Sequence, residues 1–270
     1  MKKRILITGA TDGIGLETAK VLGESGHHLL LHGRNQSKLE QVENSLLEAN
    51  PKGSIVCYVA DLSILDEVES LANKITADHQ SLDVLINNAG VFNTNNRITP
   101  DGFDVRFVVN TFAPYLLTHM LLPLLQSDGR VINLSSAAQS SVDQRALSGD
   151  LELPDFEMYA QSKLAITMWS REMAASLSPN VPSIIAVNPG SMLASKMVKD
   201  AFGVPGNDIR IGADILVRAA LSDEFKDASG LYFDNDSGQF ASPHADALDA
   251  DRCAKVLQGI NGVLKNRISS

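Results

Sequence analysis

The sequence predicts an α/β fold: a doubly wound parallel β-sheet of about seven strands with helices on both faces. Short apolar runs alternate along the chain with amphipathic helical patterns, as expected of successive strand–helix–strand crossovers. A polar or glycine-rich cluster follows nearly every apolar run. No repeat, linker or low-complexity tract interrupts this alternation, so we expect residues 1–270 to form one domain.

The strands are expected where short apolar runs lack polar alternation. Such runs, for example His28–His32, are typical of parallel strands covered on both faces. In chain order the expected strands are Arg4–Ile7, His28–His32, Ile55–Val59, Leu82–Ile86, Arg130–Leu134, Ser183–Val187 and Gly230–Phe233.

The helices are expected where apolar residues recur with helical periodicity between end signals. Asn35 is placed to cap one helix, and Asn50-Pro51 ends it. The stretch Phe103–Leu125 reads as one long helix that tolerates Pro114. The expected helices are Leu16–Glu24 with an opening near Ile14, Lys38–Glu48, Ile64–Ala77, Phe103–Leu125, Met158–Leu177, Asp208–Leu221 and Asp246–Val263.

Two longer segments lack a clear pattern. Residues 137–157 are irregular and acidic. Residues 191–207 read as a loop or broken helix, and Gly203 and Gly206 could serve as its hinges. The apolar side chains of 191–207 favour a lid over a hydrophobic substrate, although covering the sheet edge explains them equally well. They are Met192, Leu193, Met197, Val198, Phe202 and Val204.

Composition and charge narrow the function. The formal net charge of −9 argues against nucleic acid or an anionic membrane as the main partner. The two cysteines form no disulfide framework, which fits a reducing, cytoplasmic location, and the histidines show no metal-ligand spacing. We expect no signal peptide and no membrane span, because the apolar runs are too short. Asp234–Gly238 begins like a calcium loop but lacks the final glutamate, so we expect a polar turn.

The glycine-rich turn after the first strand is the first candidate binding site. Gly9, Gly13 and Gly15 are spaced G-x-x-x-G-x-G, with Thr11, Asp12 and Ile14 among them. Glycines let a ligand approach the backbone, and the helix N-terminus that follows attracts phosphate. The turn therefore predicts a phosphate or pyrophosphate seat, although a tight strand-to-helix connection would look the same.

The end of the second strand indicates which dinucleotide would bind. An NAD-binding fold places a carboxylate there for the ribose hydroxyls, whereas this chain has Gly33-Arg34. A guanidinium can pair with a 2′-phosphate, so we predict NADP(H) over NAD(H). Arg34 could also be a solvated loop arginine. Asp61 and Leu62 would lie beside the adenine, although Asp61 could instead cap the next helix.

Tyr159 and Lys163 are the candidate acid–base pair. They lie one turn apart on a predicted helix and share a face. A lysine beside a phenol favours the phenolate, so we expect a lowered Tyr159 pKa and a usable general acid or base. Most such pairs on helices are merely packed or solvated. Ser135 and Ser136, at the end of the fifth strand, could hold a substrate carbonyl.

These motifs together resemble the short-chain dehydrogenase/reductase family over essentially the whole chain, and the resemblance implies a Rossmann-type fold. Each piece is weak alone, but their order and spacing make the match specific. The matching pieces are Thr8–Gly15, Asp61, Asn87–Gly90, Asn110, Ser136, Tyr159–Lys163 and Asn188–Gly190.

The resemblance implies a Ser-Tyr-Lys catalytic set with an assisting asparagine. Tyr159 would protonate the carbonyl oxygen or deprotonate the alcohol, and Ser136 would hydrogen-bond that oxygen. Lys163 would bind the nicotinamide ribose and tune Tyr159, while Asn110 would help position Lys163 through water. Ser136 matches the family's second serine, and Ser135 is the fallback.

The resemblance also extends the expected cofactor contacts to the ends of the fourth and sixth strands. Ser195 would stand in for a family threonine that contacts the nicotinamide amide. The expected contacts there are Asn88, Ala89, Gly90, Pro189, Gly190 and Ser195, in addition to Tyr159 and Lys163.

The spacing between Ser136 and Tyr159 is longer than is usual in the family. This longer spacing resembles that of family members related to retinol dehydrogenases and protochlorophyllide reductases. We therefore expect residues 137–157 to shape the entrance of the substrate site. A homodimer or tetramer paired through the helices at 158–177 and 208–221 is possible.

The function expected on these grounds is an NADP(H)-dependent oxidoreductase that transfers a hydride between the nicotinamide and a carbonyl or alcohol substrate, small and hydrophobic. The alternative is a non-catalytic NADP(H)-sensing protein on the same fold. An epimerase or dehydratase on the same fold would normally carry a larger substrate domain, which 270 residues barely permit.

Overall fold

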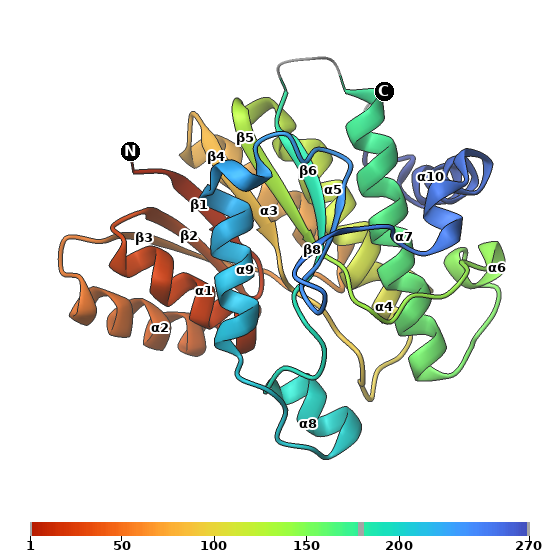
Figure 1. The fold of residues 1–270 in the computed structure, drawn as a ribbon, viewed down its shortest axis with the longest axis horizontal. Helices are drawn as coiled ribbons and strands as arrows, with labels where there is room; N and C mark the ends of the chain where they lie inside the picture. Colours follow the sequence, from red (N-terminus) through yellow and green to blue (C-terminus); the bar gives the residue numbers. More distant parts are fainter. Residues whose placement is uncertain (1, 178–180, 269–270) are drawn as a thin grey trace.

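The computed structural model describes residues 2–177 and 181–268 and shows one eight-stranded sheet (Figure 1). Its strand order is β3-β2-β1-β4-β5-β6-β7-β8, and every neighbouring pair is parallel except β7 and β8. The doubly wound α/β fold class is therefore confirmed. The strands are β1 Arg4–Ile7, β2 His28–Gly33, β3 Ser54–Val59, β4 Leu82–Asn87, β5 Leu125–Leu134, β6 Ser183–Asn188, β7 Tyr232–Asp234 and β8 Gln239–Ala241.

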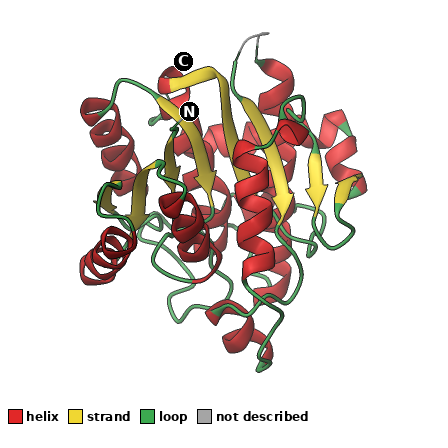
Figure 2. Cartoon of the chain, turned by 60° about the vertical axis from the view of Figure 1, so that its left-hand side comes forward, coloured by secondary structure: helices red, strands yellow, loops and turns green. Residues whose placement is uncertain are grey.

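Helices cover both faces of this sheet (Figure 2). One face carries α1, α2 and α9; the other carries α3, α5 and α7, with α10 packed on α7. The helices are α1 Gly13–Glu24, α2 Gln36–Ala49, α3 Leu65–Asp78, α4 Val105–Phe107, α5 Ala113–Leu121, α6 Gln144–Leu147, α7 Asp155–Ser176, α8 Lys196–Phe202, α9 Arg210–Leu221 and α10 Ala250–Leu264.

Two hydrophobic cores arise because strand side chains alternate between the faces. In β1, Ile5 and Ile7 enter the core under α1 and α9, whereas Leu6 enters the core under α3, α5 and α7. All three are completely buried. Because both faces are covered, these strands can be apolar at every position, which explains the continuous runs in the sequence.

The parallel strands bring their carboxyl ends to one edge of the sheet, and Figure 2 shows the arrows pointing toward the same end of the molecule. The strand order reverses between β1 and β4, which makes a topological switch point where such folds bind ligands. The glycine turn follows β1, and Asn88–Gly90 follows β4.

The expected long helix Phe103–Leu125 is divided into several parts. α4 runs into a π-helical turn, Val108–Phe112, before α5 begins. The Ala113 N–H donates to the Val108 carbonyl, and Pro114, which has no N–H, comes next. The wider π turn thus lies directly before Pro114, where the regular helical hydrogen bond cannot form. A 3₁₀ turn, Leu122–Leu124, then leads into β5, which begins earlier than the sequence predicts.

By length and composition this same stretch, 105–124, could cross a membrane, and 78% of it is buried inside the molecule. It packs in the core between α3 and α7.

Further segments can be compared with expectation. The irregular 137–157 segment contains α6 and the start of α7, which the sequence analysis did not expect. The short helix α8 lies within 191–207, in agreement with the expected loop or broken helix. The last expected strand, Gly230–Phe233, is β7, shifted to Tyr232–Asp234. The polar turn Asp234–Gly238 connects β7 to the antiparallel β8, which the sequence analysis missed. Gly238 has a φ of +69°, which suits a tight hairpin.

Candidate active site

The glycine turn requires glycine at each of its three positions. Gly9 has a φ of +66° and Gly13 a φ of +56°, in the left-handed region that side chains disfavour. Gly15 is needed for space, because a Cβ there would overlap both the Gly9 carbonyl oxygen and the Asn88 Nδ2 atom.

Asn88 fastens this turn to the end of β4. Its Nδ2 group donates to the Thr8 carbonyl at 2.8 Å and to the Gly9 carbonyl at 3.1 Å. The Ala89 N–H donates to the Thr8 hydroxyl at 3.1 Å. These bonds close the switch point between β1 and β4. Asn88 and Ala89 thus hold the backbone at the expected cofactor site.

His32, on β2, fixes the other side of the turn, and the sequence analysis did not identify it. Its Nδ1 atom accepts from the Gly9 N–H at 3.3 Å, so Nε2 carries the proton and donates to the Ala60 carbonyl at 3.0 Å. Burial lowers the His32 pKa from 6.5 to about 4, so the ring is neutral at physiological pH. The sequence could not reveal this role, because a histidine within a run of leucines gives no sign that it contacts Gly9, 23 residues earlier.

The N-terminus of α1 fits a dinucleotide phosphate. The Asp12 carboxylate accepts the Gly13 N–H, and helix geometry leaves the N–H groups of Ile14 and Gly15 without intrahelical partners. A Cβ on Gly13 would meet only the Ser195 side chain, at 3.9 Å, so this side of the turn is open to a ligand.

The ends of β2 and β3 supply the expected adenosine side of the site. A Cβ on Gly33 would lie 2.7 Å from the Thr11 side chain, which brings the exposed Arg34 beside the glycine turn. Leu62 is buried. Asp61 accepts from the Ser63 N–H and hydroxyl at 2.9 and 2.7 Å. It does not cap α3, so that alternative is wrong.

Tyr159 and Ser136 meet at the mouth of the sheet, where the Ser136 hydroxyl is close enough to the phenol to favour its ionised form. Ser136 follows β5, and its Oγ also accepts the Ala138 N–H at 3.1 Å. Ser135 faces α7 instead: it donates to the Lys163 carbonyl at 3.1 Å and lies 2.6 Å from the Thr167 hydroxyl. The structure therefore brings Ser136, and not Ser135, to Tyr159.

Burial dominates the electrostatics of Tyr159 and Lys163. Desolvation raises the Tyr159 pKa, and the hydrogen bond from Ser136 offsets only part of this rise. The expected lowering by Lys163 is therefore wrong for this structure. The Lys163 Nζ atom donates to the Leu134 carbonyl at 2.8 Å and lies 5.7 Å from the Tyr159 ring centre. Burial lowers the Lys163 pKa to about 8.

Asn110 lies in the π-helical turn and joins two elements of the site. Its Oδ1 accepts the Val91 N–H at 2.8 Å, and its Nδ2 donates to the Val91 carbonyl at 3.0 Å and the Ser162 hydroxyl at 2.9 Å. A Cβ on Gly90 would lie 3.4 Å from Asn110 Oδ1 and 3.5 Å from Lys163 Nζ. Asn110 and Lys163 therefore face each other across Gly90.

The segment after β6 is shaped by unusual backbone angles. Gly190 has a φ of +122°, and the Pro189 carbonyl accepts from Asn235 at 2.9 Å. Ser195 lies near the glycine turn, but its hydroxyl accepts the Val198 N–H as the N-cap of α8. Ser195 therefore lies beside the expected cofactor site. Its role as the N-cap of α8 also accounts for a serine at this position.

The neck of the α8 segment is closed by two backbone bonds. The Ala194 N–H donates to the Asn207 carbonyl at 2.7 Å, and the Asn207 N–H donates to the Met192 carbonyl at 2.6 Å. Beyond this neck α8 projects from the body of the molecule, at the bottom of the view in Figure 1. Leu193 is buried, whereas Met192 and Val204 are more than a third exposed. The Phe202 side chain lies outside the described part of the structure.

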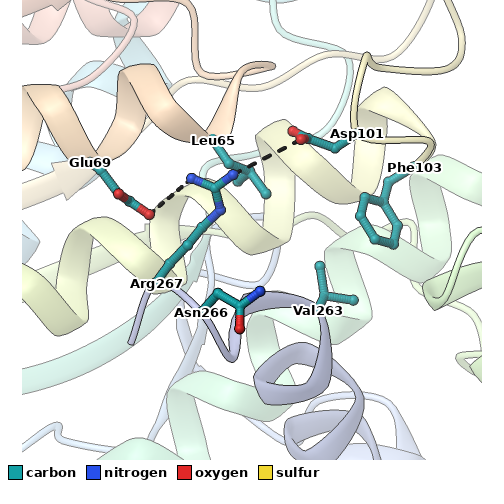
Figure 3. Close-up of a pocket in the computed structure, with 7 residues that line it drawn as sticks. All are labelled: Leu65, Glu69, Asp101, Phe103, Val263, Asn266 and Arg267. Atoms are coloured by element: carbon teal, nitrogen blue, oxygen red, sulfur yellow. Dashed lines mark hydrogen bonds and ion pairs between the residues drawn. The ribbon is translucent and has the colours of Figure 1, made fainter. Parts of the chain in front are cut away.

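A separate cavity of about 370 Å³ lies between α3, the 101–103 loop and the end of α10 (Figure 3). Arg267 crosses it to reach Glu69 at 2.9 Å and Asp101 at 4.0 Å. None of the candidate site residues lines this cavity. Its ion pairs attach the end of the chain to α3.

Comparison with known proteins decides the family. A family model described as short chain dehydrogenase matches residues 3–203. The chain belongs to this family. The chain is therefore an NAD(P)-dependent oxidoreductase that acts on a small-molecule substrate, and the resemblance seen in the sequence is confirmed.

A curated relative supports the same assignment, and solved structures share the fold. Retinol dehydrogenase 12 of Bos taurus is 31% identical over 256 residues, which cover 90% of this chain and 81% of the relative. A solved structure of an uncharacterized Mycobacterium paratuberculosis protein has a TM-score of 0.81 at 24% identity and covers 99% of this chain and 95% of its own. A short chain dehydrogenase of Shigella flexneri 2a, complexed with NADP, has a TM-score of 0.67 at 26% identity, with coverages of 86% and 96%.

The neutral state of His32 predicts an acid-sensitive fold. Its pKa is about 4 in the folded protein against an ordinary value of 6.5, so the unfolded chain takes up a proton first as the pH falls. The free energy of unfolding should therefore fall between pH 6.5 and 4, by up to about 3 kcal/mol from this group. Urea unfolding across this range should show a smaller pH slope for His32→Gln than for the wild type. Equal slopes would contradict the assignment.

Proposed function

We propose that this protein is an NADP(H)-dependent oxidoreductase that reduces a hydrophobic carbonyl compound or oxidises the corresponding alcohol. The observation that carries the proposal is the placement of Tyr159 beside Ser136, with the Lys163 Nζ atom 5.7 Å from the Tyr159 ring centre on the next turn of α7. This pair lies at the edge of the sheet that also holds the glycine turn. A bound nicotinamide would supply or accept the hydride there.

The raised pKa of Tyr159 suits it to act as the proton donor. The phenol stays protonated at neutral pH and can give its proton to a carbonyl oxygen as the alcohol forms. Ser136 can donate a hydrogen bond to the same oxygen and hold it beside Tyr159. In the reverse direction the phenol must first lose its proton, which a charged Lys163 would assist.

Lys163 remains mostly charged at neutral pH, because burial lowers its pKa only to about 8. Its Nζ atom has donors to spare beyond the one used by the Leu134 carbonyl. It faces Gly90, where a ribose hydroxyl would be held, and Asn110 faces the same point. These two residues would orient the cofactor relative to Tyr159.

Arg34 supports a preference for NADP(H) over NAD(H). It is exposed at the carboxyl end of β2, where a dinucleotide fold places the adenosine ribose, and no carboxylate occupies the position. An exposed guanidinium can bind a 2′-phosphate through two parallel hydrogen bonds.

Exposed apolar side chains support a hydrophobic substrate. Phe156, just before the catalytic turn of α7, is 53% exposed, and the Phe92 ring lies between it and Tyr159, at 6.4 and 4.9 Å between ring centres. Met192 and Val204 of the α8 segment are also exposed. We infer that residues 191–207 form a lid whose apolar face closes over the substrate.

The alternative expected from the sequence, a non-catalytic NADP(H) sensor, does not agree with membership of the short chain dehydrogenase family. Such a protein would need the glycine turn and Arg34 but not the Tyr159–Ser136 pair, which therefore disfavours it. Pairing of subunits through the helices at 158–177 and 208–221 stays a prediction, and α10 already covers part of α7.

Replacing Tyr159 by phenylalanine removes the proposed proton donor and keeps the ring. We expect kcat for carbonyl reduction to fall about 100-fold or more, with the NADPH dissociation constant changed less than about threefold. Steady-state kinetics and NADPH fluorescence measure the two effects. Tyr115→Phe is the matched control, because that hydroxyl binds Asn261, away from the site. A Tyr159→Phe variant with wild-type turnover would contradict the assignment of Tyr159 as the proton donor.

Replacing Arg34 by aspartate tests the cofactor preference. We expect NADPH binding to weaken about tenfold or more while NADH binding strengthens, because the carboxylate repels the 2′-phosphate and accepts ribose hydroxyls. Arg252→Asp is the control, because it makes the same change of charge on α10, outside the candidate site. Dissociation constants for both cofactors give the answer, and a wild-type protein that binds NADH more tightly would contradict the role of Arg34.

A further inference from the structure

Arg106 is a fully buried arginine beside the catalytic elements. It lies in α4, one turn before Asn110, and has no exposed surface. Its Nε and Nη2 groups donate to the two carboxylate oxygens of Asp104 at 2.8 and 2.6 Å. Removing a guanidinium from water is costly, and the two charged hydrogen bonds to Asp104 offset this cost.

The remaining guanidinium nitrogen of Arg106 points to the helix that carries Tyr159. Nη1 donates to the carboxylate of Asp155, the first residue of α7. Asp155 lies one turn before Tyr159, as Arg106 lies one turn before Asn110. The ion pair therefore joins the start of the π-turn segment to the start of the catalytic helix.

Asp155 also links a third element. Its carboxylate lies 2.5 Å from the Nη2 atom of Arg97, in the loop that follows β4 and carries Phe92. Arg97 is 44% exposed, so this link is far more solvated than the one to Arg106. The same carboxylate thus has one buried and one exposed partner.

The charges of this cluster persist at neutral pH. The hydrogen bond from Arg106, against the effect of burial, lowers the Asp155 pKa, and that from Arg97 adds to it. Burial alone would lower the Arg106 pKa, but the bonds to Asp104 and Asp155 raise it above its ordinary value. Both partners therefore remain ionised throughout the range in which the enzyme would work.

We propose that Arg106 and Asp155 are a positioning pair that sets the separation between Asn110 and Tyr159. Deeper in the structure the same two segments are joined at Ser162, which binds Asn110 Nδ2 and the Thr111 hydroxyl, each at 2.9 Å. The ion pair joins the same two segments at the start of α7. With both ends tied, the first turn of α7 cannot shift relative to Gly90 and Lys163. The inference rests on the proposed Ser-Tyr-Lys function.

Asp155→Asn tests this role without leaving a buried charge unpaired, because Arg106 keeps both bonds to Asp104. We expect kcat to fall about tenfold, since a small displacement of reacting groups is costly, while the dissociation constant for NADPH changes less than about twofold. Asp155→Glu restores the carboxylate and should recover at least part of the lost turnover. Arg97→Ala removes only the exposed partner and should change kcat less than about twofold.

All variants are compared well below their melting temperatures, so that loss of stability does not reduce kcat. A lower melting temperature with wild-type kcat in Asp155→Asn would show a merely structural pair and overturn the proposal. Equal losses in Asp155→Asn and Arg97→Ala would also overturn it, because the buried partner would have no special role. Tyr159→Phe is measured alongside: if it retains full turnover, the Ser-Tyr-Lys function has failed rather than the positioning role.

Discussion

The buried amide of Asn110 is the constraint on which the site depends. It holds both backbone groups of Val91, just after β4, and it holds Ser162 on α7. Asn110 makes these bonds from a π-helical turn, a local feature that is frequent at functional sites. The glycine turn, the end of β4 and the helix of Tyr159 and Lys163 are thereby placed around Gly90. A polar side chain with three bonds and almost no exposure keeps this arrangement unique, because any shift would leave a buried polar group unpaired.

Burial then gives the site its chemistry. It pushes the pKa of Tyr159 up and that of Lys163 down, so the phenol remains an acid while the amine stays near its titration range. The same effect keeps His32 neutral, which lets its ring accept from Gly9 and donate to Ala60 at once. A charged His32 would lose the bond from Gly9 and disturb the turn that would hold the phosphates. One physical cause, burial away from water, therefore acts on both the expected cofactor seat and the expected proton donor.

The sequence predicted what depends on local pattern. Uninterrupted apolar runs located the strands, and the polar clusters after them indicated the candidate site, because parallel strands bring their ends together. What it could not predict depends on contacts between distant segments. The sequence analysis treated Pro114 as tolerated within one helix and missed the π turn, and β8, with three residues, is too short to show a pattern. The direction of the Tyr159 pKa needed the depth of burial, which the one-turn spacing to Lys163 does not reveal. Arg106 and Asp155 are 49 residues apart and look like ordinary surface charges until the fold pairs them.

A crystal structure of the protein with NADPH tests the central claim most directly, namely that the edge holding the glycine turn and Tyr159 is a single site for cofactor and proton transfer. The account predicts the pyrophosphate at the N-terminus of α1, the 2′-phosphate at Arg34, and the nicotinamide beside Tyr159 and Ser136. A nicotinamide ring bound away from Tyr159, or a cofactor bound at another edge of the sheet, would contradict it.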